Sequence, residues 1–148
     1  MAKAKHRSKQ IVNRRARYDY VIGDTYIVGL ELTGAETKSL RLGLGNLSGA
    51  YVNIKDDQLW LLNATISGTG AVRINDSEQT RTRRLLAKRR EINQLVSAKQ
   101  QGNTIIPLEI LSQGRYIKLK IAAAQGKKKY DKRQTIKRRE AERQTRRA

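Results

Sequence analysis

Arginine and lysine are the residues of this chain that are grouped closely enough to act together chemically. In RTRRLLAKRR, six basic side chains fall within ten residues: Arg81, Arg83, Arg84, Lys88, Arg89 and Arg90. The last 23 residues, GKKKYDKRQTIKRREAERQTRRA, contain 11 basic and 3 acidic side chains and carry a net charge of +8. Cationic groups at this density attract polyanions and hold phosphate oxygens. These clusters therefore predict that the protein binds a polyanion and does not catalyse a reaction.

The composition argues against an enzyme. The 148 residues include 32 Lys and Arg against 13 Asp and Glu, a net charge of +19, with one histidine and no cysteine. The lack of cysteine excludes disulfides and thiolate zinc sites, and a single histidine, His6 in the basic N-terminal segment, does not support a catalytic triad. The run GLGNLSG misses dinucleotide-binding spacing and indicates a turn. We predict no catalytic residue, no metal and no cofactor.

Hydrophobic patterning predicts three parts: a disordered basic leader (1–16), a folded domain (17–125) and a basic tail (126–148). Within the domain, the sequence from Tyr18 to Leu32 predicts a strand with a break or bulge, and residues 35–42 predict a short helix stopped by glycine. Two hairpins follow from alternating patterns, YVNIK with LWLLN and TIIPLEIL with RYIKLKIA. Pro107 predicts an edge or a bulge in its strand.

The segment between the two hairpins predicts a helix from about Glu78 to Gln100, capped near Asp76 and ended by Gly102. At about 100° per residue, a core stripe is formed by Leu85, Ile92, Leu95 and Val96. Leu86 falls outside this stripe, near Arg83 and Arg90. We interpret it as an exposed leucine that presses on RNA while its basic neighbours hold phosphates; a solvated or loop-covered leucine is the alternative.

The order of these elements predicts a mainly β fold, an OB-like antiparallel β-barrel with helices against its ends. An α+β sandwich is the alternative. The sequence has no stretch of about 18 apolar residues that would span a membrane, and its N-terminus lacks an apolar signal region. We expect a monomeric cytoplasmic protein with no membrane partner.

The charge predicts a nucleic-acid partner, and the other features favour folded RNA. No helix-turn-helix or zinc-finger pattern is present, and the aromatic residues available to stack on single strands are few: Tyr18, Tyr51 and Tyr130. In the tail, Asp131 and Gln134 have capping spacing, and neither Gly nor Pro interrupts residues 130–148. We expect the tail to be disordered when free and helical on RNA, with Gly126 as its hinge.

Four stretches together resemble the SmpB (small protein B) family of bacterial tmRNA-binding proteins: NRRARYDY, GAETKSLRLGLGNL, RTRRLLAKRREI and GKKKYDKRQTIKRRE. The resemblance implies an OB-like barrel that binds the tRNA-like domain of transfer-messenger RNA. It also implies entry into a stalled ribosome together with elongation factor Tu. The tail would then lie against 16S rRNA, in the A site and the vacant mRNA channel, during the ribosome rescue called trans-translation.

The resemblance also implies roles for individual residues. The RNA-binding face would include Asn13, Arg14 and Arg15, together with Leu86 and the basic residues around it, Arg81, Arg83 and Arg90. The hinge and decoding-centre segment would be Gly126, Lys127, Lys128, Tyr130, Asp131, Lys132 and Arg133, with Ile136 and Lys137 deeper in the channel. Glu36 and Lys38 match the E-x-K-S helix of the family; for these two residues a salt-bridged structural role is an alternative of at least equal weight to a functional one.

The chain departs from the family pattern at four places, one of which is the absence of the proline that usually precedes the arginine-rich segment. Ile27 stands where a glutamate that contacts RNA is usual, Tyr18 stands where histidine is common, and the loop after Ile66 reads SGTGAV. Two alternatives to ribosome rescue remain at this point. A constitutive ribosomal protein with basic tails in rRNA fits the charge and length equally well. An RNA-processing enzyme fits less well, because the sequence contains no metal or acid/base cluster.

Overall fold

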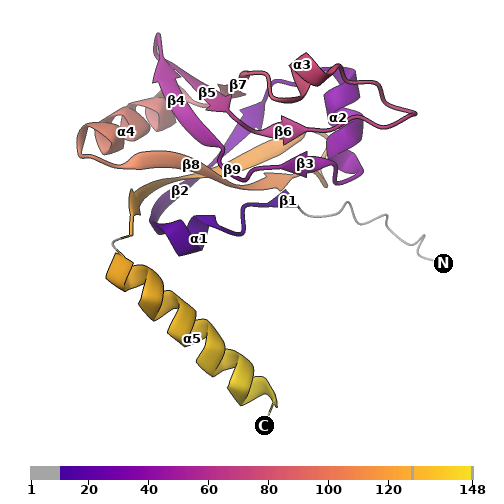
Figure 1. Cartoon of the computed structure of the whole chain (residues 1–148). Helices are drawn as coiled ribbons and strands as arrows, with labels where there is room; N and C mark the ends of the chain where they lie inside the picture. Colours follow the sequence, from indigo (N-terminus) through magenta and orange to yellow (C-terminus); the bar gives the residue numbers. More distant parts are fainter. Residues whose placement is uncertain (1–10, 128, 148) are drawn as a thin grey trace, which may run out of the picture.

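A computed structural model describes residues 11–127 and 129–147 (Figure 1). Five helices lie in these ranges: α1 (Ala16–Asp19), α2 (Gly34–Arg41), α3 (Asp76–Gln79), α4 (Arg89–Gln100) and α5 (Lys129–Arg147). The same ranges hold nine strands: β1 (Ile11–Val12), β2 (Tyr20–Leu30), β3 (Gly45–Asn46), β4 (Tyr51–Lys55), β5 (Gln58–Leu62), β6 (Thr65–Ile66), β7 (Arg83–Leu86), β8 (Thr104–Leu111) and β9 (Lys118–Gly126). The predicted mainly β fold with flanking helices is confirmed.

The main sheet closes on itself. Its strand order is β1-β8-β4-β5-β7-β2-β9, every pairing is antiparallel, and the additional pairing of β8 with β9 completes a ring. The strand β1 pairs with the C-terminal part of β8, and β3 pairs with β6 in a separate two-stranded sheet. Closure removes the exposed edges that an open sheet would present. The structure is therefore the ring-like antiparallel arrangement, not the α+β sandwich.

Both predicted hairpins are present. Asp56 and Asp57 connect β4 to β5 with φ values of 53° and 59°, the left-handed conformation that two-residue hairpin turns require. In the second hairpin the register shifts between Pro107 and Glu109, so proline sits at a bulge as predicted. The predicted break in the first long strand is a register shift between Ile22 and Thr25 in the ladder of β2 with β9.

The hydrophobic core fills the ring, and helices cover its ends. Leu59, Leu85, Leu119 and Ile121 have no exposed surface. Ile92 and Leu95 of α4 belong to the same cluster. Figure 1 shows α4 at one end of the ring and α2 at the other. The predicted helix at residues 35–42 is confirmed as α2, and Gly102, with φ of 93°, follows the end of α4 as predicted.

The prediction of one helix from residue 78 to residue 100 is wrong over its first half. Residues 83–86 form β7, which pairs with β2 and β5, and the helix begins only at Arg89. The burial pattern of β7 alternates, with Arg83 and Leu85 inside and Arg84 and Leu86 outside. The sequence did not show this alternation, because Arg83 occupies a core position and its ion-pair partner, Glu36, lies far away in the sequence. The six basic residues of RTRRLLAKRR are therefore not on one helix.

The two ends of the chain also differ from expectation. Residues 1–10 of the predicted leader lie outside the described residues, but Ile11 is buried in β1 and Ala16 is buried in α1, so the folded part begins before residue 17. The tail, expected to be disordered when free, forms the helix α5. Its good helix formers, uninterrupted by Gly or Pro, account for this. Figure 1 shows α5 extending away from the ring beyond α1.

Candidate nucleic-acid interface

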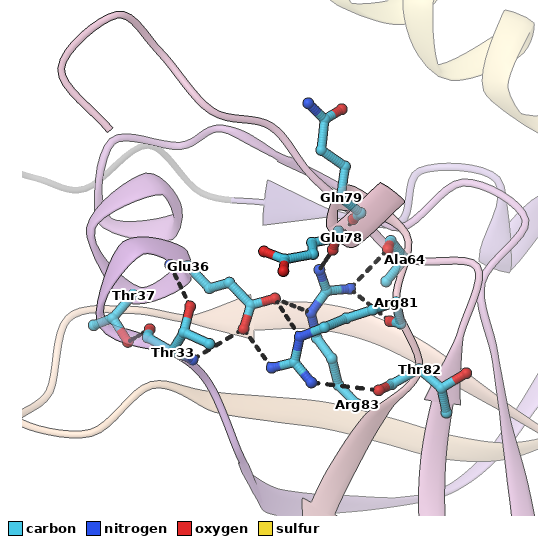
Figure 2. Close-up of polar contacts among 9 residues, drawn as sticks. All are labelled: Thr33, Glu36, Thr37, Ala64, Glu78, Gln79, Arg81, Thr82 and Arg83. Atoms are coloured by element: carbon cyan, nitrogen blue, oxygen red, sulfur yellow. Dashed lines mark hydrogen bonds and ion pairs between the residues drawn. The ribbon is translucent and has the colours of Figure 1, made fainter. Parts of the chain in front are cut away.

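A buried ion-pair cluster holds the start of β7 against α2 (Figure 2). Thr33 caps α2 and its backbone N–H donates to the Glu36 carboxylate at 2.9 Å, which directs that side chain toward β7. Arg83 donates from Nε to Glu36 Oε2 at 2.6 Å, and Arg81 donates from Nε to the same oxygen at 3.1 Å. One carboxylate therefore serves two guanidinium groups, and the structural alternative for Glu36 is confirmed.

Arg83 is not an RNA-binding residue in this structure, which corrects the prediction. Its side chain has 0% exposure, and its two terminal nitrogens donate to four backbone carbonyls, those of Ala64, Arg81, Glu78 and Gln79, at 2.9–3.2 Å. A guanidinium with all its donors satisfied inside the protein has none left for a phosphate. Arg81 is different, because about a third of its side chain (34%) is exposed beside the cluster.

The pKa values of the cluster follow from burial and pairing. Burial raises the pKa of Glu36, but hydrogen bonds from Arg81, the Thr33 amide and Arg83 outweigh it, so the pKa lies below its ordinary value. The hydrogen bond to Glu36 raises the pKa of Arg81, whereas desolvation lowers the pKa of Arg83. Arginine keeps its proton at neutral pH, so the cluster carries a net positive charge.

A second feature is a partly apolar, partly cationic strip on the outside of the ring, which we call the outer strip: Ile27, Leu86, Lys118 and Lys120. Gly29 of β2 lies opposite Leu86 of β7 on one side and Lys118 of β9 on the other, so the three residues form one row across the sheet. Leu86 and Ile27 are 51% and 53% exposed. Leu86 is thus exposed as predicted, although on a strand and not a helix.

Glycine permits the close approach in this row. A Cβ added at Gly29 would lie 3.1 Å from the Cβ of Leu86, a tight contact to which the leucine would have to adjust. The departure noted at Ile27 matters here, because an aliphatic residue in place of an acid leaves Ile27 and the neighbouring Leu86 as apolar surface beside Lys118 and Lys120. Apolar surface flanked by ammonium groups suits ribose or base contacts beside phosphates.

The start of α4 continues the positive charge. Lys88, Arg89 and Arg90 are all exposed, and the backbone N–H of Lys88 donates to the Glu91 carboxylate at 3.1 Å, which fixes the helix start. Arg89 lies 3.5 Å from Asp57 in an exposed pair that contributes little to stability. Arg90 is exposed on the first turn. The start of α4 therefore presents exposed cationic groups to solvent.

A separate basic surface, the α1 surface, comprises the exposed residues Arg14, Arg15 and Arg17. Asn13 does not point freely outward: its Nδ2 donates to the Pro107 carbonyl at 2.9 Å and ties β1 to the bulge in β8. The Arg15 guanidinium lies 5.2 Å from the centre of the Tyr18 ring and 3.5 Å from Asp19. Asn13 therefore positions this surface, while the arginines remain exposed on it.

The tail leaves the body at the α1 surface. Tyr20 and Gly126 are the last pair of the β2–β9 ladder. The Lys127 backbone N–H then donates to the Asp19 carbonyl at 2.9 Å, and its Nζ donates to the Arg17 carbonyl at 2.7 Å. Lys127 thus holds the end of α1, a position where a cation also complements the helix dipole. This arrangement places the predicted hinge, Gly126, directly before an anchored residue.

The remaining tail residues lie on or just before α5. Lys128 lies outside the described residues, and Tyr130, Asp131 and Lys132 lie in the first turn of α5. Arg133, Ile136 and Lys137 are exposed on the helix. All other described side chains of α5, residues 138–145, are exposed as well. The exposed helix leaves its cationic groups available to an external polyanion.

Sequence patterns alone did not identify Lys118 and Lys120 as candidate RNA-binding residues. They also did not predict the two hydrogen bonds that Lys127 donates to α1. The alternation in IKLKIA places both lysines outside, but only the strand order brings them beside Leu86. Within residues 11–127 and 129–147, no group of three His, Cys, Asp or Glu residues is placed to hold a metal ion. No helix in those ranges is long and apolar enough to cross a membrane.

A closed antiparallel ring with two basic surfaces and an exposed basic helix defines a small protein built to bind a phosphate-rich polymer. The SmpB protein family model matches residues 10–148. The SsrA-binding protein of Roseiflexus sp. (strain RS-1) is 46% identical over 140 residues, covering 92% of this chain and 87% of that protein. The SsrA-binding protein of Gloeobacter violaceus is 42% identical over 149 residues, covering 100% of this chain and 98% of that protein.

A solved structure is also similar. The chain matches a protein in the structure described as "tmRNA-SmpB: a journey to the center of the bacterial ribosome", with a TM-score of 0.67 and 35% identity over 81% of this chain and 85% of that one. The chain belongs to the SmpB family.

Proposed function

We propose that this protein binds the tRNA-like domain of transfer-messenger RNA (SsrA RNA) and delivers it to stalled ribosomes for trans-translation. The observation that carries this proposal is the match to the SmpB family over residues 10–148, supported by relatives named SsrA-binding proteins that align over nearly their whole length. The protein acts as an RNA-binding factor and not as an enzyme.

The two parts of the molecule take different tasks in this proposal. The body binds the folded RNA through the outer strip, Arg81, Arg90 and the α1 surface, since these groups are exposed or partly exposed on the ring and its flanking helices. The tail enters the A site and the empty mRNA channel, where α5 lies against 16S rRNA. Its support is the exposed, cationic helix, which a channel walled by phosphates would neutralise.

Further details complete the proposal. The protein acts as a monomer in the cytoplasm, where bacterial ribosomes translate, and elongation factor Tu carries the complex to the ribosome. In this proposal the tail, residues 126–148, acts as a unit distinct from the ring. The boundary of the ring extends to β1, because Ile11 and Asn13 contact β8.

The RNA that copurifies with the protein tests this function. The full chain, purified from growing cells at moderate salt, is expected to carry one dominant RNA with a tRNA-like end. Bulk ribosomal RNA in fixed proportions, resisting a high-salt wash, would overturn the proposal and favour a constitutive ribosomal protein.

A further inference from the structure

The loop between β8 and β9 exposes a large aromatic side chain. Tyr116 is 69% exposed, the highest value among the large hydrophobic side chains whose exposure the structure describes. It lies two residues before Lys118, and the residue between them, Ile117, is buried in the core. Tyr116 and Lys118 are both exposed on either side of this buried residue, so Tyr116 lies two residues before the Lys118 end of the outer strip.

Arg41, in the last turn of α2, holds this loop in one conformation. Its Nη1 donates to the carbonyls of Ser112 and Gly114 at 2.9 and 3.2 Å, and its Nη2 donates to those of Gly114 and Arg115 at 3.2 and 3.0 Å. A guanidinium that bonds three successive parts of a loop fixes the loop backbone from within the protein. The exposed tyrosine is thus presented by an ordered support.

The neighbouring arginine completes a mixed surface. The Arg115 guanidinium lies 5.5 Å from the centre of the Tyr116 ring, within the range of a cation–π contact. An aromatic ring with a guanidinium beside it can stack on a nucleobase while the cation meets the adjacent phosphate. A tyrosine that only faced solvent would need neither the Arg115 guanidinium beside its ring nor the hydrogen bonds from Arg41 to the three loop carbonyls.

We propose that Tyr116 and Arg115 form a base-stacking contact for the bound RNA, and that Arg41 is a positioning residue for it. The contact extends the outer strip beyond Leu86 toward the β8–β9 loop. The ligand is an unpaired nucleobase with its phosphate in a folded RNA, since an isolated ring recognises the face of a base and not its sequence. This inference rests on the proposed RNA-binding function.

Aromatic replacement tests the contact. Binding of tmRNA is measured for the full chain and for Tyr116→Phe, Tyr116→Trp and Tyr116→Leu. The phenylalanine and tryptophan variants are expected to bind within about threefold of the unchanged protein, and the leucine variant roughly ten- to hundredfold more weakly, the range for losing one stacked base. Equal affinity of the leucine variant would overturn the inference.

Two further measurements separate the possible outcomes. Arg41→Met is expected to weaken RNA binding while its unfolding midpoint in urea shows that the ring remains folded, and combining it with Tyr116→Leu should add little further loss. Fully additive losses would contradict the positioning role. If the unchanged protein fails to bind tmRNA at all, the proposed function fails, which is a different result from equal binding by all Tyr116 variants.

Discussion

Glu36 pairs with two arginines that lie 45 and 47 residues away in the sequence, and one of them, Arg83, has no exposed surface. Replacing Glu36 with glutamine would leave Arg83 buried without a counter-charge. We expect Glu36→Gln to lower the free energy of unfolding by about 3–5 kcal/mol, as for other broken buried pairs. Urea unfolding measures this change. Glu142→Gln, which makes the same chemical change on an exposed side chain, should cost under about 0.5 kcal/mol.

The effect of Glu36 should also depend on pH. Because its pKa is lowered in the folded protein, the unfolded chain binds the proton more tightly, and the stabilisation is fully present above the unfolded pKa of about 4.3. It is lost as the pH falls through the folded pKa. The difference in unfolding free energy between the unchanged protein and Glu36→Gln should therefore shrink from pH 7 to pH 3. A constant difference would mean that Glu36 does not act through its charge.

Leu86 offers a test of the outer strip. Leu86→Asp places a carboxylate where we expect RNA, so tmRNA affinity should fall by at least about tenfold, or about 1.4 kcal/mol. Fluorescence anisotropy with labelled tmRNA measures this loss. Leu42→Asp is the matched control, because Leu42 is equally exposed but lies at the end of α2. Similar losses from both variants would indicate general charge repulsion and not a specific contact.

At the scale of elements, short sequence patterns correctly predicted those helices, hairpins and bulges that contacts between nearby residues determine. Both hairpins, α2 and the bulge at Pro107 follow from alternation, capping and the missing proline N–H, all readable within about ten residues. The strand β7 was missed because one of its two buried residues is Arg83, a charged side chain that is stable in the core only through its ion pair with the distant Glu36. The exposed position of Leu86 was predicted from the wrong element, since both a helix and a strand place it outside.

Lys127 connects two elements, and this contact predicts the orientation of the tail. Lys127→Met removes the hydrogen bond from Nζ to the Arg17 carbonyl, so α5 should sample a wider range of directions relative to the ring. The chain has no cysteine, so spin labels at Arg138→Cys and Lys55→Cys report one distance without interference. The variant should broaden that distance distribution, whereas Lys137→Met, an exposed lysine on α5, should not. An unchanged distribution would show that Lys127 does not fix the tail.

At the scale of the whole molecule, the net charge of +19 serves two separate parts. The closed ring supports the outer strip and the α1 surface, and its core does not depend on the tail, because the described side chains of α5 are exposed. Removal of the tail should therefore leave tmRNA binding by the ring intact and abolish only the activity on the ribosome. What sequence could not show is the physical junction between them, because Asp19, Arg17 and Lys127 meet only when β2 pairs with β9.

One paired measurement tests this division most directly. A chain ending at Lys127 keeps the ring and the contact with α1 but lacks α5. Its affinity for isolated tmRNA and its support of peptide tagging on ribosomes stalled at truncated messages are compared with those of the full chain. We predict affinity within about threefold, or about 0.65 kcal/mol, and no tagging. Loss of both activities together, or tagging at the full level, would contradict the account.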